Sequence, residues 1–221
     1  MVKIQVNSSG KAYYTSSGKV LLAPESGGGE FQLERIKDDS NNEIGTAFMI
    51  FEDANENKFK VVCLDAQYRY SLTQWCSQRS AVTNMPVYDS NLIAWWYDDA
   101  KETATANTQL ILDYCSSGGY TSTACSHCRS KSFTIGGTTY YGQLPNMREV
   151  LDMWRRRVQI ETMDTSASSQ SSFNFSSART IWSSTQYNNT NGWYLHTSGA
   201  VHFSSKITNY FACPVLEIPV Q

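Results

Sequence analysis

An amphipathic helical segment between two groups of strand-forming segments is the feature that most constrains the fold. In the stretch LPNMREVLDMWRRR, which starts at residue 144, apolar residues recur at the spacing of one helix face. Those residues are Met147, Val150, Leu151 and Trp154. Pro145 and Asn146 suit the start of a helix, and the arginines at 155–157 suit its C-terminal dipole as a solvated helix end. A shorter helix is predicted at residues 107–115, with Asn107 as its N-cap.

Strand-forming segments stand on both sides of these helices. Before them, residues 45–52 and 58–65 predict a hairpin, because the residues between them, DANEN, have turn chemistry. After them, strands are predicted at residues 180–184, 192–197, 200–204 and 210–218. Strands, two helices and then strands predict an α+β fold with a mixed or antiparallel sheet.

The chain is predicted to divide into an N-terminal β arm with a linker, residues 1–43, and one larger domain, residues 44–221. The arm contains a hairpin of residues 11–15 and 19–23, followed by a glycine-rich breaker. Within the domain, residues 166–177 read SASSQSSFNFSS. A segment so poor in apolar residues cannot bury a core, and we expect it to form a surface loop.

Composition excludes several classes of partner. At 221 residues, one core should dominate, and a formal net charge of −2 supplies no counter-charge for a nucleic-acid backbone. No stretch approaches the run of about 20 apolar residues that a membrane helix needs. The start MVKIQVNSSGKAYY lacks the apolar core of a secretory signal. We therefore expect a protein made in the cytoplasm, with no nucleic-acid partner and no membrane insertion.

Residues 116–142 are predicted to form a cysteine-rich insertion that includes the hairpin sequence SFTIGGTTYYG. Cys115, Cys125 and Cys128, with His127 between the last two, form a weak candidate zinc site, because thiolates and imidazoles are zinc ligands. A second Cys-x-x-Cys pair is missing. Free thiols or a disulfide within the loop are therefore favoured over a structural zinc ion, and redox activity ranks last.

No catalytic machinery is recognisable in the sequence. Nucleophilic catalysis commonly needs a histidine base, and the chain has three histidines, His127, His196 and His202, none in a catalytic motif. Calcium would need convergent carboxylates, and residues 165–216 contain no Asp or Glu. The sequence predicts a protein that is not an enzyme and needs no cofactor.

The segment YNNTNGWYLHTSGAVHFSSKITNYF, residues 187–211, carries the functional signal. In residues 192–197 alternation turns Trp193 and Leu195 inward, and in residues 200–204 it turns Val201 and Phe203 inward. An ordinary sheet with a polar solvent side explains alternation alone, but exposed Tyr and His beside Asn and Thr loops are typical of binding surfaces. The predicted ligand-binding residues are Tyr187, Asn188, Asn189, Tyr194, His196, His202, Ser204, Thr208, Asn209, Tyr210 and Phe211.

The C-terminal motifs resemble a known family. WSST at residues 182–185, GWY at 192–194 and CPV at 213–215, with Gly199 and Lys206 between them, are similar to the variable proteins of diversity-generating retroelements and their formylglycine-generating-enzyme-like relatives. The resemblance covers residues 44–221 and implies a C-type-lectin-like fold. It also implies display of a diversified ligand-binding surface, a bacterial surface protein or glycan as ligand, and a homotrimer.

In that family, error-prone copying of template adenines converts Asn codons into NNY triplets. Within residues 187–211 only Trp193 and Lys206 fall outside the NNY set. With no secretory signal, we expect a phage tail or host-attachment protein, found in the virion.

Two alternatives remain open at the level of the sequence. The chain could be a fixed structural component of a virion or bacterial surface, without a variable site. It could also be a formylglycine-generating-type enzyme, but those relatives need an active cysteine or a cysteine pair near the C-terminus, and Cys213 stands there alone, where the family usually has arginine.

Overall fold

The computed structural model describes residues 12–14, 20–22, 31–88, 102–164, 180–196 and 198–220. The chain forms two compact units, Met1–Phe31 and Gln32–Gln221. In the first unit, β1 (Ala12–Tyr14) pairs antiparallel with β2 (Val20–Leu22), as the sequence predicts. All other described elements belong to the second unit. The predicted surface loop at 166–177 lies outside the described residues.

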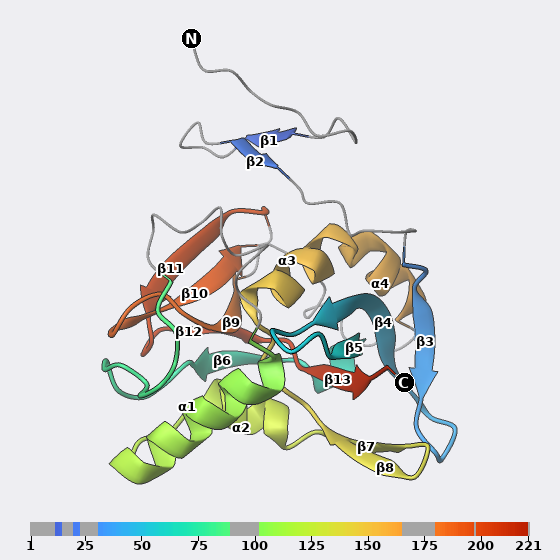
Figure 1. The fold of residues 1–221 in the computed structure, drawn as a ribbon, viewed down its shortest axis with the longest axis horizontal. Helices are drawn as coiled ribbons and strands as arrows, with labels where there is room; N and C mark the ends of the chain where they lie inside the picture. Colours follow the sequence, from blue (N-terminus) through green and yellow to red (C-terminus); the bar gives the residue numbers. More distant parts are fainter. Residues whose placement is uncertain are drawn as a thin grey trace. The chain divides into compact units, whose positions relative to one another are not determined.

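Two sheets, one separate hairpin and several helices make up the larger unit (Figure 1). The four-stranded sheet has the order β13-β5-β4-β3, the five-stranded sheet has the order β11-β10-β9-β12-β6, and β7 pairs with β8. The strands are β3 Glu34–Lys37, β4 Glu43–Glu52, β5 Lys58–Leu64, β6 Tyr70–Gln74, β7 Ser132–Ile135, β8 Thr138–Tyr141, β9 Thr180–Gln186, β10 Asn191–His196, β11 Val201–Ser205, β12 Asn209–Ala212 and β13 Val215–Pro219. The helices are α1 Ala104–Gly118, α2 Thr123–Arg129, α3 Met147–Arg155 and α4 Arg157–Met163, with a 3₁₀ turn, η1, at Ala66–Tyr68.

The five-stranded sheet is mixed, because β12 runs parallel to β9 while its other pairings are antiparallel. All pairings of the four-stranded sheet are antiparallel. Helices α3 and α4 lie on one side of the five-stranded sheet, and α1 and α2 lie on the other (Figure 1). This arrangement confirms the α+β class, although the described chain has four helices where the sequence predicted two.

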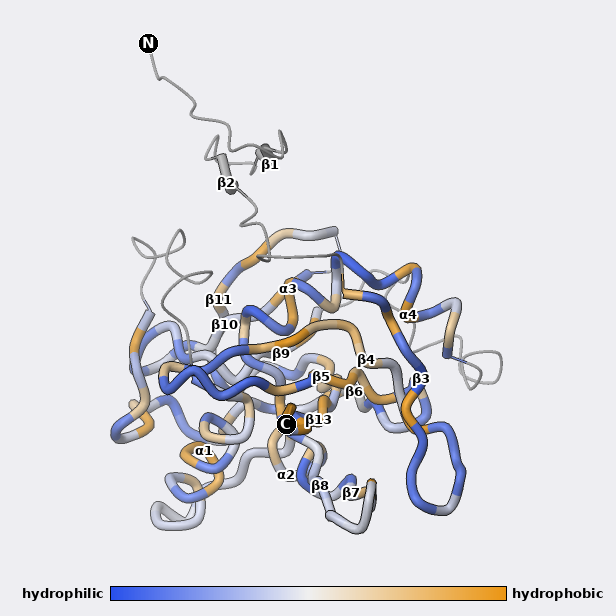
Figure 2. The backbone as a smooth tube through the Cα atoms, turned by 45° about the vertical axis from the view of Figure 1, so that its right-hand side comes forward, coloured by the Kyte–Doolittle hydropathy of each residue, from blue (hydrophilic) through white to orange (hydrophobic). Residues whose placement is uncertain are grey.

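Each face of the five-stranded sheet covers a separate hydrophobic core, because successive residues of a strand point to opposite faces. Ile181 and Trp193 belong to the first core, which also contains Phe48 of β4 and Val150 of α3. Along the tube, hydrophobic residues concentrate in the strands at the centre of the unit, whereas the connection from β3 to β4 is hydrophilic (Figure 2). The first core therefore joins the two sheets through α3.

The second core lies on the opposite face of the same sheet. Trp182, the neighbour of Ile181, packs there with Trp75, with Ile111 of α1 and with Cys125 of α2. Burial of an aromatic or aliphatic side chain of this size stabilises the fold by about 1.5–3 kcal/mol. Trp182 also donates from Nε1 to the carbonyl of Thr73 at 3.0 Å, so its polar atom is satisfied.

Helix α3 begins where the sequence predicts. Asn146 is its N-cap, and a capping box forms because the Asn146 side chain accepts from the Glu149 amide while the Glu149 side chain accepts from the Asn146 amide, both at 2.9 Å. The buried stripe includes Met147 and Val150 as predicted, and also Met153, which the sequence reading omitted.

Helix α1 begins earlier than predicted. Its N-cap is Thr103, whose side chain accepts from the Ala106 amide at 3.0 Å, so the assignment of Asn107 as N-cap is wrong. Asn107 instead lies inside the helix, buried, with Nδ2 3.3 Å from the Ser184 hydroxyl. A threonine caps a helix as asparagine does, so residue type alone does not locate the first turn of this helix.

The cysteine-rich segment 116–142 contains the predicted β7–β8 hairpin but also helix α2, which the sequence did not predict. Cys125 and Cys128 of α2 are buried in the second core, so this part of the segment belongs to the body of the fold. Free cysteine behaves as a small hydrophobic residue, which explains its place there.

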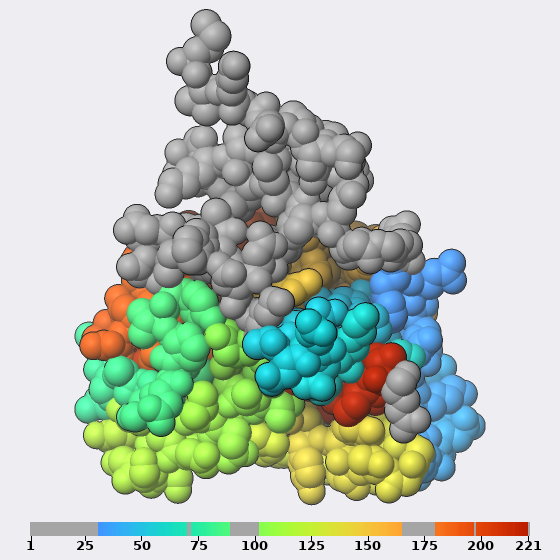
Figure 3. Space-filling model, viewed as in Figure 1, coloured from blue at the N-terminus to red at the C-terminus, as the bar shows by residue number. Residues whose placement is uncertain are grey.

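The strand predicted at residues 210–218 is two strands in different sheets. β12 pairs in the five-stranded sheet and β13 in the four-stranded sheet, and the chain changes sheet at Cys213 and Pro214. Proline has no backbone N–H for a strand ladder, which suits a crossover. In the space-filling view, β13 lies between the β4–β5 hairpin and the β7–β8 hairpin (Figure 3).

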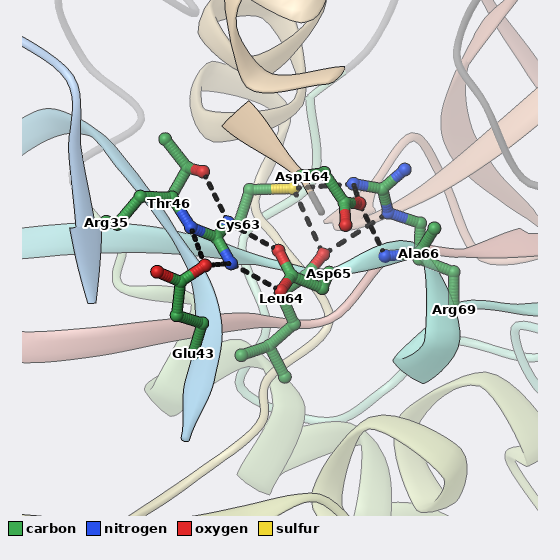
Figure 4. Close-up of polar contacts among 9 residues, drawn as sticks. All are labelled: Arg35, Glu43, Thr46, Cys63, Leu64, Asp65, Ala66, Arg69 and Asp164. Carbon is green, nitrogen blue, oxygen red and sulfur yellow. Dashed lines mark hydrogen bonds and ion pairs between the residues drawn. The ribbon is translucent and has the colours of Figure 1, made fainter. Parts of the chain in front are cut away.

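A buried ionic network ties β3 and α4 to the end of β5 (Figure 4). Arg35 binds Asp65 in a bidentate pair at 2.7 and 2.6 Å. Arg69 lies 3.6 Å from Asp164, whose carboxylate accepts from the Ala66 amide at 2.8 Å. β3 lies before the predicted domain start at residue 44, and this network joins it to the larger unit.

Candidate functional site

The segment 187–211 forms β10, β11, most of β12 and the turns between them. β10 lies between β11 and β9, and Tyr194 is paired with His202 on one side and with Trp182 on the other. β12 lies on the far side of β9, where Phe211 is the partner of Ile181. The predicted site residues therefore lie on β10, β11 and β12, with β9 between β10 and β12, and in the adjoining turns.

One face of these strands carries a group of aromatic and hydroxyl side chains above Trp182. We call this group the tyrosine surface, and it consists of Tyr194, His202, Ser204, Thr208 and Tyr210. The Tyr194 and Tyr210 rings are 4.8 Å apart, and the His202 ring lies 5.8 Å from that of Tyr194. His202 is exposed, and the other four are half-buried.

Hydrogen bonds fix the hydroxyl groups of the tyrosine surface. Tyr210 donates its hydroxyl to Ser204 at 3.3 Å, and the Ser204 and Thr208 hydroxyls are 3.1 Å apart. Burial raises the pKa of Tyr194, and the neighbouring Tyr210 raises it further. Tyr194 therefore keeps its proton at neutral pH and offers a neutral O–H donor to a ligand.

The opposite face holds two other predicted site residues. Tyr187 stacks on Phe203 with ring centroids 3.9 Å apart and packs edge-on against Trp193 at 4.8 Å. Phe211 packs against the first core. Tyr187 and Phe211 are therefore on a different face from the tyrosine surface, and the structure does not bring all the predicted residues together.

Phe203 corrects a prediction. It shares the face of Trp193, as alternation requires, but 46% of it is exposed, whereas the sequence reading placed it inside. β11 is the edge strand of the sheet, which leaves this side chain without a neighbour strand beyond it. Phe203 and the stacked Tyr187 add an apolar contact on the second face.

The remaining predicted residues lie in the turns and at a strand end. Asn188 accepts from the amides of Thr190 and Asn191, both at 2.9 Å, which shapes the β9–β10 loop. Asn189 is exposed in that loop, and Asn209 is exposed at the start of β12. His196 lies with Nδ1 2.8 Å from the Ser198 hydroxyl, so it stabilises the β10–β11 turn.

Helix α3 positions the β10–β11 turn. Gly199 has φ +90°, and a Cβ there would lie 2.5 Å from Trp154 of α3. The turn therefore packs directly on the helix, at a place that only glycine fits.

Lys206 anchors the turn that follows β11. Its ammonium group is fully buried and donates to the Gln186 side chain at 2.5 Å, the Ser80 carbonyl at 2.7 Å and the Asn189 carbonyl at 3.0 Å. It also lies 4.5 Å from the centre of the Trp75 ring. Burial lowers the pKa of Lys206 to about 8. One side chain thus joins the segment after β6, the end of β9 and the β9–β10 loop beneath the predicted site.

All six cysteines are free and buried. The Cys115 sulfur lies 3.2 Å from that of Cys76, while Cys125 and Cys128 lie on α2. His127 directs Nε2 to the Tyr68 carbonyl at 2.7 Å. Across residues 31–88, 102–164, 180–196 and 198–220, no three His, Cys, Asp or Glu side chains are grouped to hold a metal ion. The described helices include none long and apolar enough to cross a membrane.

Comparison with known proteins gives one structural relationship. The chain matches no known protein family and no curated protein. Among solved structures it is similar to a fimbrial protein from Bacteroides ovatus, with 16% identity and a TM-score of 0.51. The match covers 97% of this chain and 49% of that one, so the chain spans about half the length of the solved protein. At this identity the likeness concerns the fold.

Sequence reasoning missed Leu72, which lies in the unpredicted strand β6. It is 73% exposed and has φ +60°, a conformation that a bulky residue rarely adopts. The next residue, Thr73, is the partner of Tyr210 in β12 and donates its hydroxyl to the Tyr210 carbonyl at 2.5 Å. The strand-forming residues Tyr70, Thr73 and Trp75 in the sequence YSLTQW are the signal that could have revealed this strand.

Proposed function

We propose that this chain is a non-enzymatic attachment protein, whose C-type-lectin-like domain displays a ligand-binding surface built on β10, β11 and β12. The tyrosine surface is its centre. Tyrosine and histidine rings give large contact areas at low entropy cost, and the serine and threonine hydroxyls supply adaptable hydrogen bonds. We expect a bacterial surface protein or glycan as ligand, and a homotrimer that multiplies weak contacts into avidity.

The observation that carries the proposal is the burial of the two residues of segment 187–211 that fall outside the NNY set. Trp193 and Lys206, which NNY codons cannot encode, are both buried, at 1% and 0% exposure. Trp193 donates from Nε1 to the Tyr88 carbonyl at 2.9 Å, and Lys206 donates to Ser80, Gln186 and Asn189. The exposed His202, Asn189 and Asn209 all belong to the NNY set. This division supports a scaffold that tolerates diversification at its surface.

The likeness to a fimbrial protein supports a role on a cell or virion surface. A phage tail protein and a bacterial adhesin both need a rigid domain that presents loops to a partner. Because its C-terminal motifs also resemble retroelement variable proteins, we favour a virion protein that attaches to the host.

A second candidate is a fixed structural subunit of a surface fibre, without a binding site. The structural similarity to a fimbrial protein favours this candidate. In that case the tyrosine surface is only the solvent side of a sheet.

A binding assay separates the two candidates. Fluorescently labelled protein is incubated with a panel of intact bacteria and with an immobilised array of bacterial glycans. The double variant His202→Ala/Tyr210→Phe removes an exposed ring and a hydroxyl, and should weaken saturable binding by about tenfold or more. Tyr141→Ala, at a side chain 49% exposed on β8, is the control and should leave binding unchanged.

The absence of saturable binding to any cell or glycan by the wild-type chain would favour the structural role. Equal binding by the double variant and the wild type, with unaltered circular dichroism, would instead show that the tyrosine surface is not the binding site. Sequencing the gene's 3′ end and its flanking DNA across a population tests diversification separately. Substitutions confined to exposed positions of 187–211, beside a template repeat that differs at adenines, are expected.

A further inference from the structure

Two buried cysteines from distant parts of the chain meet in the second core. The sulfur atoms of Cys76 and Cys115 are 3.2 Å apart, although the residues are 39 apart in sequence. Cys76 follows β6 and is 0% exposed, and Cys115 lies in α1 and is 2% exposed. A disulfide S–S bond is about 2.05 Å long, so the two sulfurs need to approach by only about 1 Å.

Backbone hydrogen bonds hold the two segments in register around the thiols. The Cys76 amide donates to the Lys206 carbonyl at 3.1 Å, and the Ser77 amide donates to the Thr121 carbonyl at 2.7 Å. The Thr121 amide in turn donates to the Ser77 hydroxyl at 3.0 Å. The Tyr120 amide donates to the Cys115 carbonyl at 2.7 Å, which ties the end of α1 to the same place. The contact between the two sulfurs therefore lies where hydrogen bonds already hold the two segments together.

We propose that Cys76 and Cys115 form a disulfide bond when the protein meets an oxidising thiol–disulfide pool. The proposal does not depend on what the tyrosine surface binds. It also differs from a disulfide within the segment 116–142, because it joins Cys115 of α1 to Cys76, which follows β6.

The chemistry balances with a small disulfide such as oxidised glutathione as oxidant. The Cys76 thiolate attacks one glutathione sulfur, and the first glutathione leaves as a thiolate. The Cys115 thiolate then attacks the Cys76 sulfur, and the second glutathione leaves. Two electrons pass from the protein sulfurs to the oxidant, and the two thiol protons end on two molecules of reduced glutathione.

The local electrostatics assign Cys76 the first attack. The hydrogen bond with Cys115 lowers the pKa of Cys76 to about 7 and raises that of Cys115. This contact favours the thiolate form of Cys76, which is the attacking species. Residues 77–79 are exposed, so opening of this short loop, or oxidation during folding, gives the oxidant access.

The bond would strengthen the support of the tyrosine surface. Loop 76–80 ends at Ser80, whose carbonyl accepts from Lys206, and whose hydroxyl contacts the Tyr114 hydroxyl of α1. Linking Cys76 to α1 covalently would hold this loop, and through Lys206 the Asn189 loop as well. Disulfides persist in oxidising environments, as on the surfaces of cells and virions.

Peptide mapping of the wild-type chain tests the proposal directly. The full chain is equilibrated with reduced or oxidised glutathione, and its free thiols are alkylated in denaturant and digested with trypsin and chymotrypsin. Cleavage after Trp75 and Arg79 releases CSQR, and cleavage after Tyr120 separates Cys115 from Cys125 and Cys128. The oxidised sample should contain CSQR linked to a peptide that carries Cys115, with the other four cysteines alkylated.

Thermal unfolding provides the second readout. Oxidation should raise the wild-type midpoint by roughly 5–10 °C, because the bond closes a long loop in the unfolded chain. Cys76→Ser and Cys115→Ser should each abolish this shift, whereas Cys128→Ser, from the same core, should keep it. Six alkylated cysteines after oxidation, or a linkage between any other pair, would overturn the proposal, and the wild-type map decides even if a variant fails to fold.

Discussion

Lys206 shows how one buried charge can organise a surface. Its ammonium group has three carbonyl-type acceptors and an aromatic ring around it. A buried ammonium is costly unless its donors are satisfied, and here each of its three donors has an acceptor. The acceptors lie in the loop before α1, in β9 and in the β9–β10 loop, so the residue sets their spacing.

Replacing Lys206 by methionine should destabilise the protein by about 3 kcal/mol, because similar volume is kept while three buried acceptors lose their donor. Urea unfolding of the two proteins measures the difference. Lys58→Met, at a side chain 58% exposed, is the matched control and should change stability by less than about 0.5 kcal/mol. A loss of the same size in both variants would show that Lys206 does not act through its buried contacts.

The buried Glu149 should make the stability of the protein depend on pH. Its side chain is fully buried beside Glu217, and burial, followed by the charge of Glu217, raises the pKa of Glu149 well above its usual value, against the smaller effect of Arg148. The folded form therefore keeps the proton while the unfolded form loses it near pH 4.5. Wild-type stability should fall as pH rises above that value, by up to about 1.4 kcal/mol per pH unit until the folded form also ionises.

Glu149→Gln removes this titration and keeps an acceptor for the Asn146 amide. We expect the variant to be more stable than the wild type at neutral pH, with a difference that grows as pH increases from about 5 to 7. Urea unfolding at a series of pH values measures it. Glu52→Gln, at an exposed carboxylate, should leave the pH profile of the wild type unchanged. A constant difference between Glu149→Gln and wild type across this range would contradict the prediction.

At the scale of elements, the β10–β11 turn depends on its contact with α3. Gly199→Ala should cost about 2–3 kcal/mol, because φ is +90° and the new Cβ would lie 2.5 Å from Trp154. Gly119→Ala is the matched control, since φ is +69° with no heavy atom within 4 Å of the Cβ position, and should cost about 1 kcal/mol. Denaturant unfolding ranks the two variants. Equal costs would mean that only the backbone conformation matters and that the helix contact does not.

Local signals made part of these elements predictable. The capping residue, the apolar stripe and the turn chemistry around α3 and the β4–β5 hairpin act within a few residues, and the structure has both elements. Helix α2 was not predictable in the same way, because its buried side chains are cysteines whose burial depends on packing against β6 and β12. The division between β12 and β13 likewise depends on two sheets that the local sequence does not describe.

The strands of the candidate site could be predicted from the sequence. The sheet face on which each of its side chains lies, and whether that side chain is buried, could be predicted only in part. Alternation placed Trp193 and Leu195 inside, at 1% and 0% exposure. It could not reveal that β11 is an edge strand, which leaves Phe203 exposed, or that Tyr187 stacks on that ring. Lys206 was visible as the single charge of the segment, but its acceptors come from positions far apart in the sequence.

At the scale of the whole molecule, the larger unit should fold without the first 31 residues. Among the residues that the structure describes, every side chain of the two hydrophobic cores comes from Leu33 or a later position. The two sheets are formed within Gln32–Gln221. A chain that starts at Gln32 should therefore unfold cooperatively within about 2 °C of the full chain, by scanning calorimetry.

A chain that starts at residue 42 is the sharper comparison, because it also lacks β3. That truncation removes the pairing of β3 with β4 and the bidentate contact of Arg35 with Asp65. It also removes Asp39, whose carboxylate accepts from the amides of Gly136 and Gly137 at 2.7 and 2.9 Å. Because a buried Asp65 would lose its partner, the unfolding free energy should fall by about 3–5 kcal/mol. If both truncations lowered the midpoint equally, the unit would depend on residues 1–31, and the boundary between the two units would have no energetic meaning.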